Sequence, residues 1–161
     1  MIKLLKFKQF KSLFFIFIKH PIFIYPTLKA TSASMLMAQK EFPNIHGKNN
    51  KANAFRHALW NILLVQELLK WNKNKMNAIQ FTNIVTTWHE DFSPNKPLEK
   101  AMDLHNNEVG RGMIKKLLED NLKPSKGQIA SYLNQKLALS VKIAKIEAVK
   151  QYPNTLIYLE D

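Results

Sequence analysis

Residues 52–71 are the stretch of this chain that most constrains its fold. Leu59, Ile62 and further leucine, isoleucine and valine residues leave little polar surface on a helix built from this stretch. A helix that is apolar around most of its circumference belongs in the centre of a domain, where other helices cover it. We therefore predict that it is buried. Because Arg56, His57 and Asn61 lie on it, these polar groups must find hydrogen-bond partners.

The rest of the chain also has mostly helical spacing. Apolar residues at helical intervals, with Pro, Gly and Asn at the breaks, predict helices over residues 77–90, 97–121 and 126–139 and an amphipathic stretch over 145–151. Another helix is expected to begin at Ser32 or Ser34, because serine is a good N-cap, and to end near Gln39, before a loop over residues 42–50.

The C-terminal residues 155–159 are rich in strand-forming side chains. Since one strand cannot make a sheet, this tail either pairs with a short segment such as residues 140–143 or packs in an extended form. The predicted fold class is therefore mainly α: a single, helical-bundle-like domain over residues 35–161, with a short extended or strand-like C-terminal tail.

Residues 1–34 form a basic, aromatic N-terminal segment. The first 40 residues carry seven lysines and no acidic residue, and the longest apolar run, residues 13–18, is six residues long. That run is much shorter than the roughly 18 to 20 residues that a transmembrane helix needs. A basic start, an apolar stretch and small residues at 30–34 follow the order of a signal peptide, but Lys19, His20 and Pro21 interrupt it. Two interpretations remain: a membrane-interface segment, or a helix that packs onto the domain.

Charge and cysteine content limit the partners. The net charge of +12 favours an anionic substrate or an anionic membrane surface, and nucleic acid is a further option. The expected location is cytoplasmic or peripheral at the membrane, with secretion left open; nothing in the pattern indicates an oligomeric state. The absence of cysteine excludes disulfides and thiolate sites, so a divalent metal ion would be bound by His, Asp, Glu or Asn.

Arginine is rare in this lysine-rich chain. Only two of the 24 basic residues are arginines, and Arg56 and Arg111 both lie in the densest polar stretches, residues 53–61 and 102–111. A planar, permanently charged guanidinium suits bidentate binding of carboxylate or phosphate. The alternative is that each arginine closes a buried structural pair.

The predicted helix over residues 97–121 carries a polar row. Asp103, Asn107 and Arg111 follow at intervals of four, so they project from one side of the helix. Gly110 and Gly112 flank Arg111, although each weakens a helix by about 1 kcal/mol relative to Ala. Close approach of another backbone or of a ligand would explain these glycines, and a local kink is the plainer alternative.

Three antiparallel helices would bring the polar clusters together at one end of a bundle. One hypothesis is a metal site of His57, His89 and Asp103, with Glu90 as a further ligand. Another is metal-free hydrolysis with a histidine as general base and the arginines stabilising negative charge. In a third, the cluster is structural and the protein is a binding or membrane-surface module. The candidate catalytic residues are His57, His89, Glu90 and Asp103, and the candidate substrate-binding residues are Arg56, Asn107 and Arg111.

Three motifs, NAFRHALW at 53–60, HE at 89–90 and MDLHNNEVGR at 102–111, resemble those of a bacterial family catalogued as a domain of unknown function. The resemblance covers roughly residues 45–160. It implies a mostly helical domain, found alone or attached to larger bacterial proteins, and it carries no activity with it. The order of the His and acidic residues also resembles HD-type phosphohydrolases, although those proteins have an aspartate where Glu90 stands. We expect a hydrolase of a phosphoester or another anionic substrate. The matching residues are Arg56, His57, Trp60, His89, Glu90, Asp103, Asn106, Asn107 and Arg111.

Overall fold

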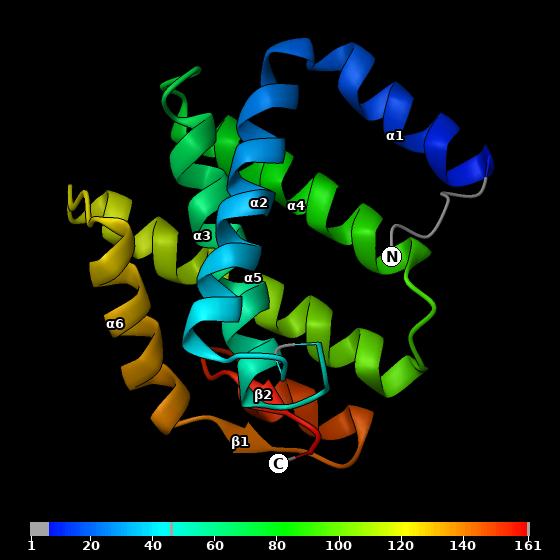
Figure 1. Ribbon diagram of the computed structural model, residues 1–161, viewed down its shortest axis with the longest axis vertical. Coiled ribbons are helices and arrows are strands. Elements are labelled where there is room, and N and C mark those ends of the chain that lie inside the picture. Colours follow the sequence, from blue (N-terminus) through cyan, green and yellow to red (C-terminus); the bar gives the residue numbers. More distant parts are fainter. Residues whose placement is uncertain (1–6, 46, 161) are drawn as a thin grey trace.

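The computed structural model describes residues 7–45 and 47–160, so the predictions that involve residues 1–6 and His46 lie outside the described residues. The predicted mainly α class is confirmed (Figure 1). In chain order the elements are α1 (Phe7–Lys19), η1 (Pro21–Phe23), α2 (Ile24–Glu41), α3 (Lys51–Leu68), α4 (Lys75–Phe92), α5 (Pro97–Glu119), α6 (Lys126–Ala138), β1 (Val141–Lys142), η2 (Ile146–Gln151) and β2 (Ile157–Tyr158).

Helix α3 is the centre of the domain, as its composition predicts. It contacts α2, α4, α5, α6 and β2, and Figure 1 shows it behind α2 in the middle of the molecule. Apart from Trp60, its apolar residues, Phe55 and Leu59 among them, are buried, and so are the polar Asn53, His57 and Asn61. Asn50 caps its N-terminus by accepting a hydrogen bond from the backbone N–H of Asn53. The core therefore has polar groups built into its middle.

Helix α2 begins at Ile24, so the predicted start at Ser32 or Ser34 is wrong. Pro26 lies in its first turn, where a missing N–H breaks no intrahelical hydrogen bond, and the helix can therefore start before the serines. Ser34 donates to the carbonyl of Thr31 within the helix and does not cap it. Since Ala30, Ser34 and Ala38 are buried at intervals of four, one small-residue face of α2 packs against α3. The boundary expected at residue 34 falls inside this helix.

The N-terminal helices are joined by a sharp bend. Among the described residues, no single helix is long and apolar enough to cross a bilayer. One bent pair of helices, Lys11–Lys19 and Pro21–Glu41, is long and apolar enough by length and composition when its two parts are taken together, and the angle between the parts is 107°. Phe17 at the end of α1 and Phe23 in η1 contact Phe81 of α4. This segment therefore has one side against the domain.

The C-terminal tail pairs with the segment after α6, which confirms one of the two predicted arrangements. Val141 lies opposite Ile157 and Lys142 opposite Tyr158 in a parallel two-stranded sheet. Asn106 of α5 holds the tail from the other side, because its side-chain amide donates to the Ile157 carbonyl at 2.9 Å and accepts from the Ile157 N–H at 3.0 Å. His105 Nε2 lies 2.8 Å from the Thr155 carbonyl. Two of the motif residues therefore fasten the tail to α5.

Gly110 marks the closest approach between α3 and α5. A Cβ atom at this position would lie 2.6 Å from the carbonyl oxygen and 2.7 Å from the Cα of Ala58, whereas a Cβ at Gly112 would meet no atom within 4 Å. Close approach of another backbone is therefore the explanation for Gly110. No such contact explains Gly112, which is exposed.

Gly110→Ala should lower the free energy of unfolding by about 1–3 kcal/mol or more, because the backbone of Ala58 cannot move aside as a flexible side chain would. Gly112→Ala on the same helix is the matched control and should raise it by up to about 1 kcal/mol. Denaturant unfolding of both variants measures the difference. Equal stabilities would contradict the close contact.

Candidate functional site

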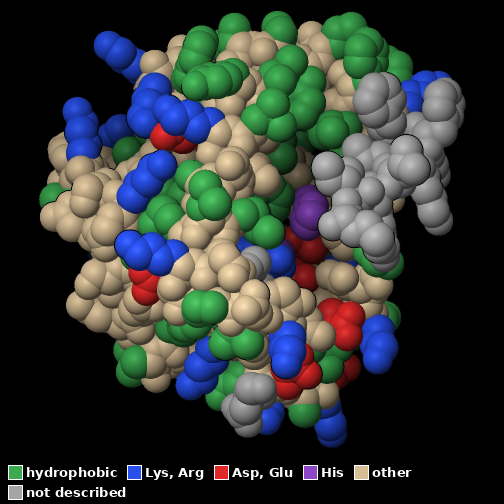
Figure 2. Space-filling model, in the orientation of Figure 1, with side chains coloured by type: hydrophobic (Ala, Val, Ile, Leu, Met, Phe, Trp, Pro, Cys, Tyr) green, Lys and Arg blue, Asp and Glu red, His purple; other side chains and the backbone are tan. Residues whose placement is uncertain are grey.

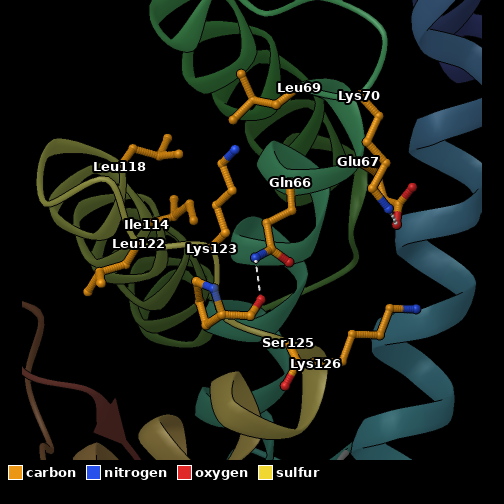
Figure 3. Close-up of a pocket in the computed structure, with 11 residues that line it drawn as sticks. Gln66, Glu67, Leu69, Lys70, Ile114, Leu118, Leu122, Lys123, Ser125 and Lys126 are labelled. Carbon is orange, nitrogen blue, oxygen red and sulfur yellow. Dashed lines mark hydrogen bonds and ion pairs between the residues drawn. The ribbon is translucent and has the colours of Figure 1, made fainter.

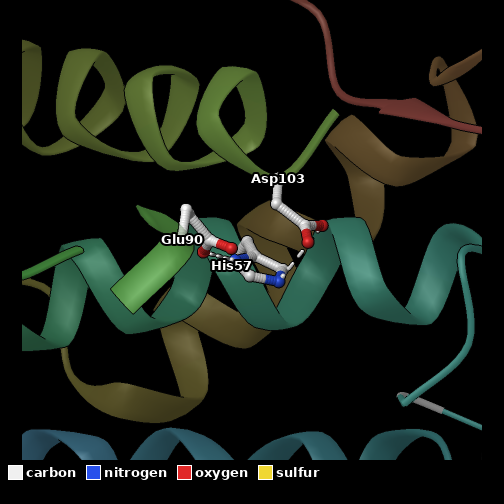
Figure 4. A group of neighbouring side chains, drawn as sticks. All are labelled: His57, Glu90 and Asp103. Atoms are coloured by element: carbon white, nitrogen blue, oxygen red, sulfur yellow. Dashed lines mark ion pairs between the residues drawn. The ribbon is translucent and has the colours of Figure 1, made fainter. Parts of the chain in front are cut away.

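His57 lies between two carboxyl groups in the middle of the domain. Its Nδ1 is 3.3 Å from Glu90 Oε1, and its Nε2 is 3.3 Å from Asp103 Oδ1. Figure 4 shows the imidazole between the two acids. The three side chains come from three different helices: His57 from α3, Glu90 from the last turn of α4 and Asp103 from α5. All three side chains are buried. Two acids and one imidazole are thus gathered away from bulk water.

Helices α3 and α5 hold this group through a regular ladder of side chains. Asn53 donates to Asp103, His57 is hydrogen-bonded to Asn107, and Arg111 donates to Asn61. The partners in each pair are 50 residues apart in sequence. Because the residue numbers rise in the same direction along both helices from one pair to the next, α3 and α5 run parallel. Helix α4, which lies between them in the chain, runs antiparallel to both, because His57 and Asn61 of α3 meet Glu90 and Thr86 of α4 in reverse order. Consecutive helices of the three are therefore antiparallel, as expected.

The hydrogen bonds of Asn107 assign the proton of the imidazole. Asn107 Nδ2 donates to Glu90 Oε1 at 3.0 Å, so its Oδ1 accepts from Asn61 at 2.7 Å and from His57 Nδ1 at 3.2 Å. The other ring nitrogen, Nε2, accepts from Arg56 Nη2 at 3.0 Å. His57 is therefore a neutral imidazole with its proton on Nδ1.

Burial changes the proton affinity of every group in the cluster. Burial, and secondly the charge of Arg56, holds the pKa of His57 well below its ordinary value of 6.5. Burial raises the pKa of Glu90 from 4.5 to about 7. Burial and then the neighbouring Glu90 raise the pKa of Asp103 from 3.8 to about 7. Two carboxyl groups that titrate near neutral pH beside a neutral histidine form a set suited to proton transfer.

Amide side chains that the sequence did not single out complete the surroundings of Asp103 and Arg56. Asn95, in the loop before α5, donates to Asp103 Oδ2 at 2.8 Å, and Asn53 accepts from Arg56 Nη2 at 2.6 Å. The four-residue spacing of Asn53, His57 and Asn61 is the signal that could have found Asn53. Asn95 has no such signal, because its position depends on the path of a loop.

A pocket of about 190 Å³ reaches the cluster from outside. His57 and Arg56 line it, together with Trp60 and residues of α2. Figure 2 shows a hollow in the surface where a histidine lies beside basic and acidic side chains. Its lining residues are Thr31, Ser34, Met35, Arg56, His57, Trp60 and His89. A ligand in this pocket would therefore meet the imidazole and the guanidinium.

The other predicted residues take different places. His89 lines this pocket and packs edge-on against Trp60 at 5.3 Å; partial burial and the charge of Arg56 lower its pKa. Arg111 is not among the described residues that line the pocket, and it donates to Asn61 Oδ1 at 2.9 Å and to Thr86 Oγ1 at 3.1 Å. The structure thus brings Arg56, His57, Glu90, Asp103 and Asn107 together, with His89 at the pocket wall and Arg111 one turn further along α5.

Possible metal ligands form a group of three. One oxygen or nitrogen atom each from His57, Glu90 and Asp103 lies within 4.8 Å of the others, and His89 is not in this group among the described residues. Glu90 Oε2 is buried without a hydrogen-bond partner in the described part of the chain. An unsatisfied buried carboxylate oxygen is costly, and a bound cation would satisfy it.

A larger pocket, of about 450 Å³, lies between α3, the end of α5 and the start of α6 (Figure 3). Glu67, the one acid among the described residues that line it, lies 2.6 Å from Lys70 and 3.3 Å from Lys29, and Gln66 donates to the Pro124 carbonyl. Both polar side chains are already bound to partners within the protein, and the described residues that line this pocket include no histidine. We therefore place the candidate site at His57.

The fold and the site together define a mainly helical domain built around a buried histidine and two carboxyl groups. Residues 14–141 match the family described as a domain of unknown function, DUF6973, and the chain belongs to that family. The match begins in α1, earlier than the expected residue 45, and ends at residue 141, before the expected residue 160. No curated protein and no solved structure matches the chain.

Glu90→Gln removes a carboxyl group whose pKa is about 7 in the folded protein and ordinarily 4.5. The folded wild type binds a proton at Glu90 more tightly than the unfolded chain does. The stability that this proton binding contributes is therefore lost as pH rises from about 4.5 to about 7. The unfolding free energy of the variant minus that of the wild type should therefore increase across this window and level off above it. Denaturant titrations with a chelator present measure it. The control is Glu119→Gln, an exposed carboxyl on α5; the same profile for both variants would contradict the raised pKa.

Proposed function

We propose that this protein is a hydrolase of a phosphoester or another anionic substrate, with His57 at the centre of its active site. The observation that carries the proposal is the position of the neutral His57 imidazole, between Glu90 and Asp103 and at the inner end of a pocket. A buried acid–base group that a pocket reaches is the arrangement expected of an active site. A polar network that only stabilised the fold would not require a pocket that reaches it from outside.

Arg56 supplies the positive charge for an anionic substrate. Its guanidinium lines the pocket and touches His57 Nε2 and Asn53. When an anionic group enters the pocket, the guanidinium can turn toward it, and that movement frees Nε2. The charge then stabilises the negative oxygens of the transition state.

Hydrolysis without a metal follows from the same groups. Nε2 of His57 takes a proton from water while the water oxygen forms a bond to the phosphorus or carbonyl carbon, and the ester bond to the leaving oxygen breaks. A carboxyl group with a pKa of about 7, Asp103, then supplies the proton that the leaving alkoxide needs. Asn107 keeps the Nδ1 proton in place throughout, since its Oδ1 accepts from Nδ1.

A divalent metal ion fits the same residues. His57, Glu90 and Asp103 offer one nitrogen and carboxylate oxygens, a donor set that suits zinc or manganese. Such an ion, when bound, would polarise the substrate and lower the pKa of a bound water. Arg56 now lies beside Nε2, so it would have to turn into the pocket for Nε2 to become a ligand.

A non-enzymatic binding or membrane-surface module is the second candidate. The observation in its favour is that every residue of the α3–α5 ladder has a partner within the protein. Under this alternative the cluster fixes the register of two helices and carries out no reaction.

His57→Gln and Asp103→Asn test the two candidates. If the site is catalytic, each variant should remain folded and lose hydrolysis of bis-p-nitrophenyl phosphate or of p-nitrophenyl esters by about 100-fold or more. His105→Gln is the matched control, because His105 is a buried histidine that binds the tail carbonyl of Thr155, and it should retain activity.

Elemental mass spectrometry of the same proteins shows whether a metal is bound and whether His57→Gln and Asp103→Asn lose it. Thermal unfolding separates loss of activity from loss of fold. Variants that unfold while the wild type hydrolyses none of these substrates, with or without added zinc or manganese, would favour the structural module.

A further inference from the structure

An exposed apolar stripe runs along α2. Ile24, Leu28 and Leu36 are among its members, and the last two are 63% and 70% exposed. The members fall into two groups about two helical turns apart, on the side of α2 away from the small-residue face that packs on α3. The stripe consists of Ile24, Tyr25, Leu28, Met35 and Leu36. The described part of the domain leaves this apolar stripe uncovered.

The stripe continues onto neighbouring elements. Phe14, Phe15 and Ile18 of α1 and Ile22 of η1 are each at least half exposed. Tyr25 also meets the exposed Trp71 edge-on at 5.7 Å. Figure 2 shows hydrophobic side chains gathered over the bend between α1 and α2, on the same face as the hollow. We call this surface, formed by α1, η1 and the stripe of α2, the apolar face. Large exposed apolar patches mark interaction sites.

The charge around the apolar face selects the kind of partner. Lys11, Lys19 and Lys40 are exposed on α1 and α2, and the first 40 residues contain no acid. Aromatic and aliphatic side chains interspersed with lysines are the composition of segments that lie in the interface of an anionic membrane. A second copy of the chain would bring the same positive charge against it, which is unfavourable.

The apolar face and the candidate site share a residue. Met35 belongs to the exposed stripe of α2 and also lines the pocket that reaches His57 and Arg56. A lipid leaving the membrane at α2 would therefore reach the pocket without crossing open water. Trp60 and Met35 are apolar wall residues, and Arg56 is the cation further in.

We propose that the apolar face rests in the surface layer of an anionic membrane, and that the substrate of the His57 site is an ester of an anionic phospholipid. The second part rests on the proposed hydrolase function. The protein lies on the membrane and does not cross it, because the small-residue face of α2, with Ala30 and Ala38, is already buried against α3. Spanning would expose that core.

Sedimentation with vesicles tests the membrane contact with the full chain. The wild type should bind vesicles of phosphatidylglycerol and phosphatidylcholine in equal parts more strongly than vesicles of phosphatidylcholine alone. Leu36→Ser should weaken binding to the anionic vesicles, and Leu28→Ser with Leu36→Ser should weaken it by at least about tenfold. Leu139→Ser at the end of α6 is the matched control, because Leu139 is also 70% exposed, and it should bind as the wild type does.

Three results would overturn the membrane contact: no binding to either vesicle, equal loss with Leu139→Ser, or membrane association that alkaline extraction cannot reverse. A further overturning result is a dimer in light scattering that the Leu28 and Leu36 substitutions dissociate, since the face would then join two copies.

Activity assays on the same vesicles keep the two proposals separate. Vesicle binding without release of a lipid product, by a protein that hydrolyses soluble esters, overturns the lipid substrate and leaves the proposed function in place. Vesicle binding by a protein that hydrolyses nothing leaves the membrane contact and overturns the proposed function. Lipid hydrolysis that Leu28→Ser with Leu36→Ser slows, while hydrolysis of a soluble ester is unchanged, supports both.

Discussion

The contact between Ala58 and Gly110 is the constraint on which the rest of the structure depends. Only at this separation, where a Cβ on Gly110 would lie 2.6 Å from the Ala58 carbonyl, can short amide and carboxyl side chains bridge α3 and α5 directly. Asn53, His57 and Asn61 then meet Asp103, Asn107 and Arg111 as three consecutive steps of one ladder. A wider helix pair would leave these groups unpaired in an apolar core, where each missing hydrogen bond costs about 1–3 kcal/mol. The contact of Ala58 with Gly110 therefore sets both the distance between α3 and α5 and the positions of the polar side chains between them.

The buried carboxyl groups of the site lower the stability of the fold, and their raised pKa values reflect this cost. Leucine in place of Glu90 and Asp103 would remove two buried carboxyl groups from the core, whereas here both have a pKa of about 7 and one oxygen of Glu90 has no partner among the described residues. Proteins keep such groups where a local loss of stability accompanies a task. The amides of Asn107, Asn53 and Asn95 limit the loss, since they bind the acids without adding charge.

Much of the fold follows from local patterns, and less of the site does. The apolar circumference of residues 52–71 predicts a buried central helix, and the four-residue spacing of Asp103, Asn107 and Arg111 predicts a polar row. The pairing of side chains between two helices is a tertiary property, so sequence spacing could not show that Asp103 pairs with Asn53 and Asn107 with His57. Ser32 and Ser34 suggested a helix start, yet α2 begins before Pro26 because burial against α3 extends the helix beyond its local signals. Asn95 reaches Asp103 only through the course of a loop.

The contacts of Asn106 and His105 with the C-terminal tail join two segments that are synthesised at different times. The amide of Asn106 binds Ile157 and His105 binds Thr155, so both residues of α5 are synthesised about fifty residues before these partners. Asp103 and Asn107 lie on the same two turns of α5. These contacts therefore become available later in synthesis than the ladder between α3 and α5, whose partners all precede the tail in the chain.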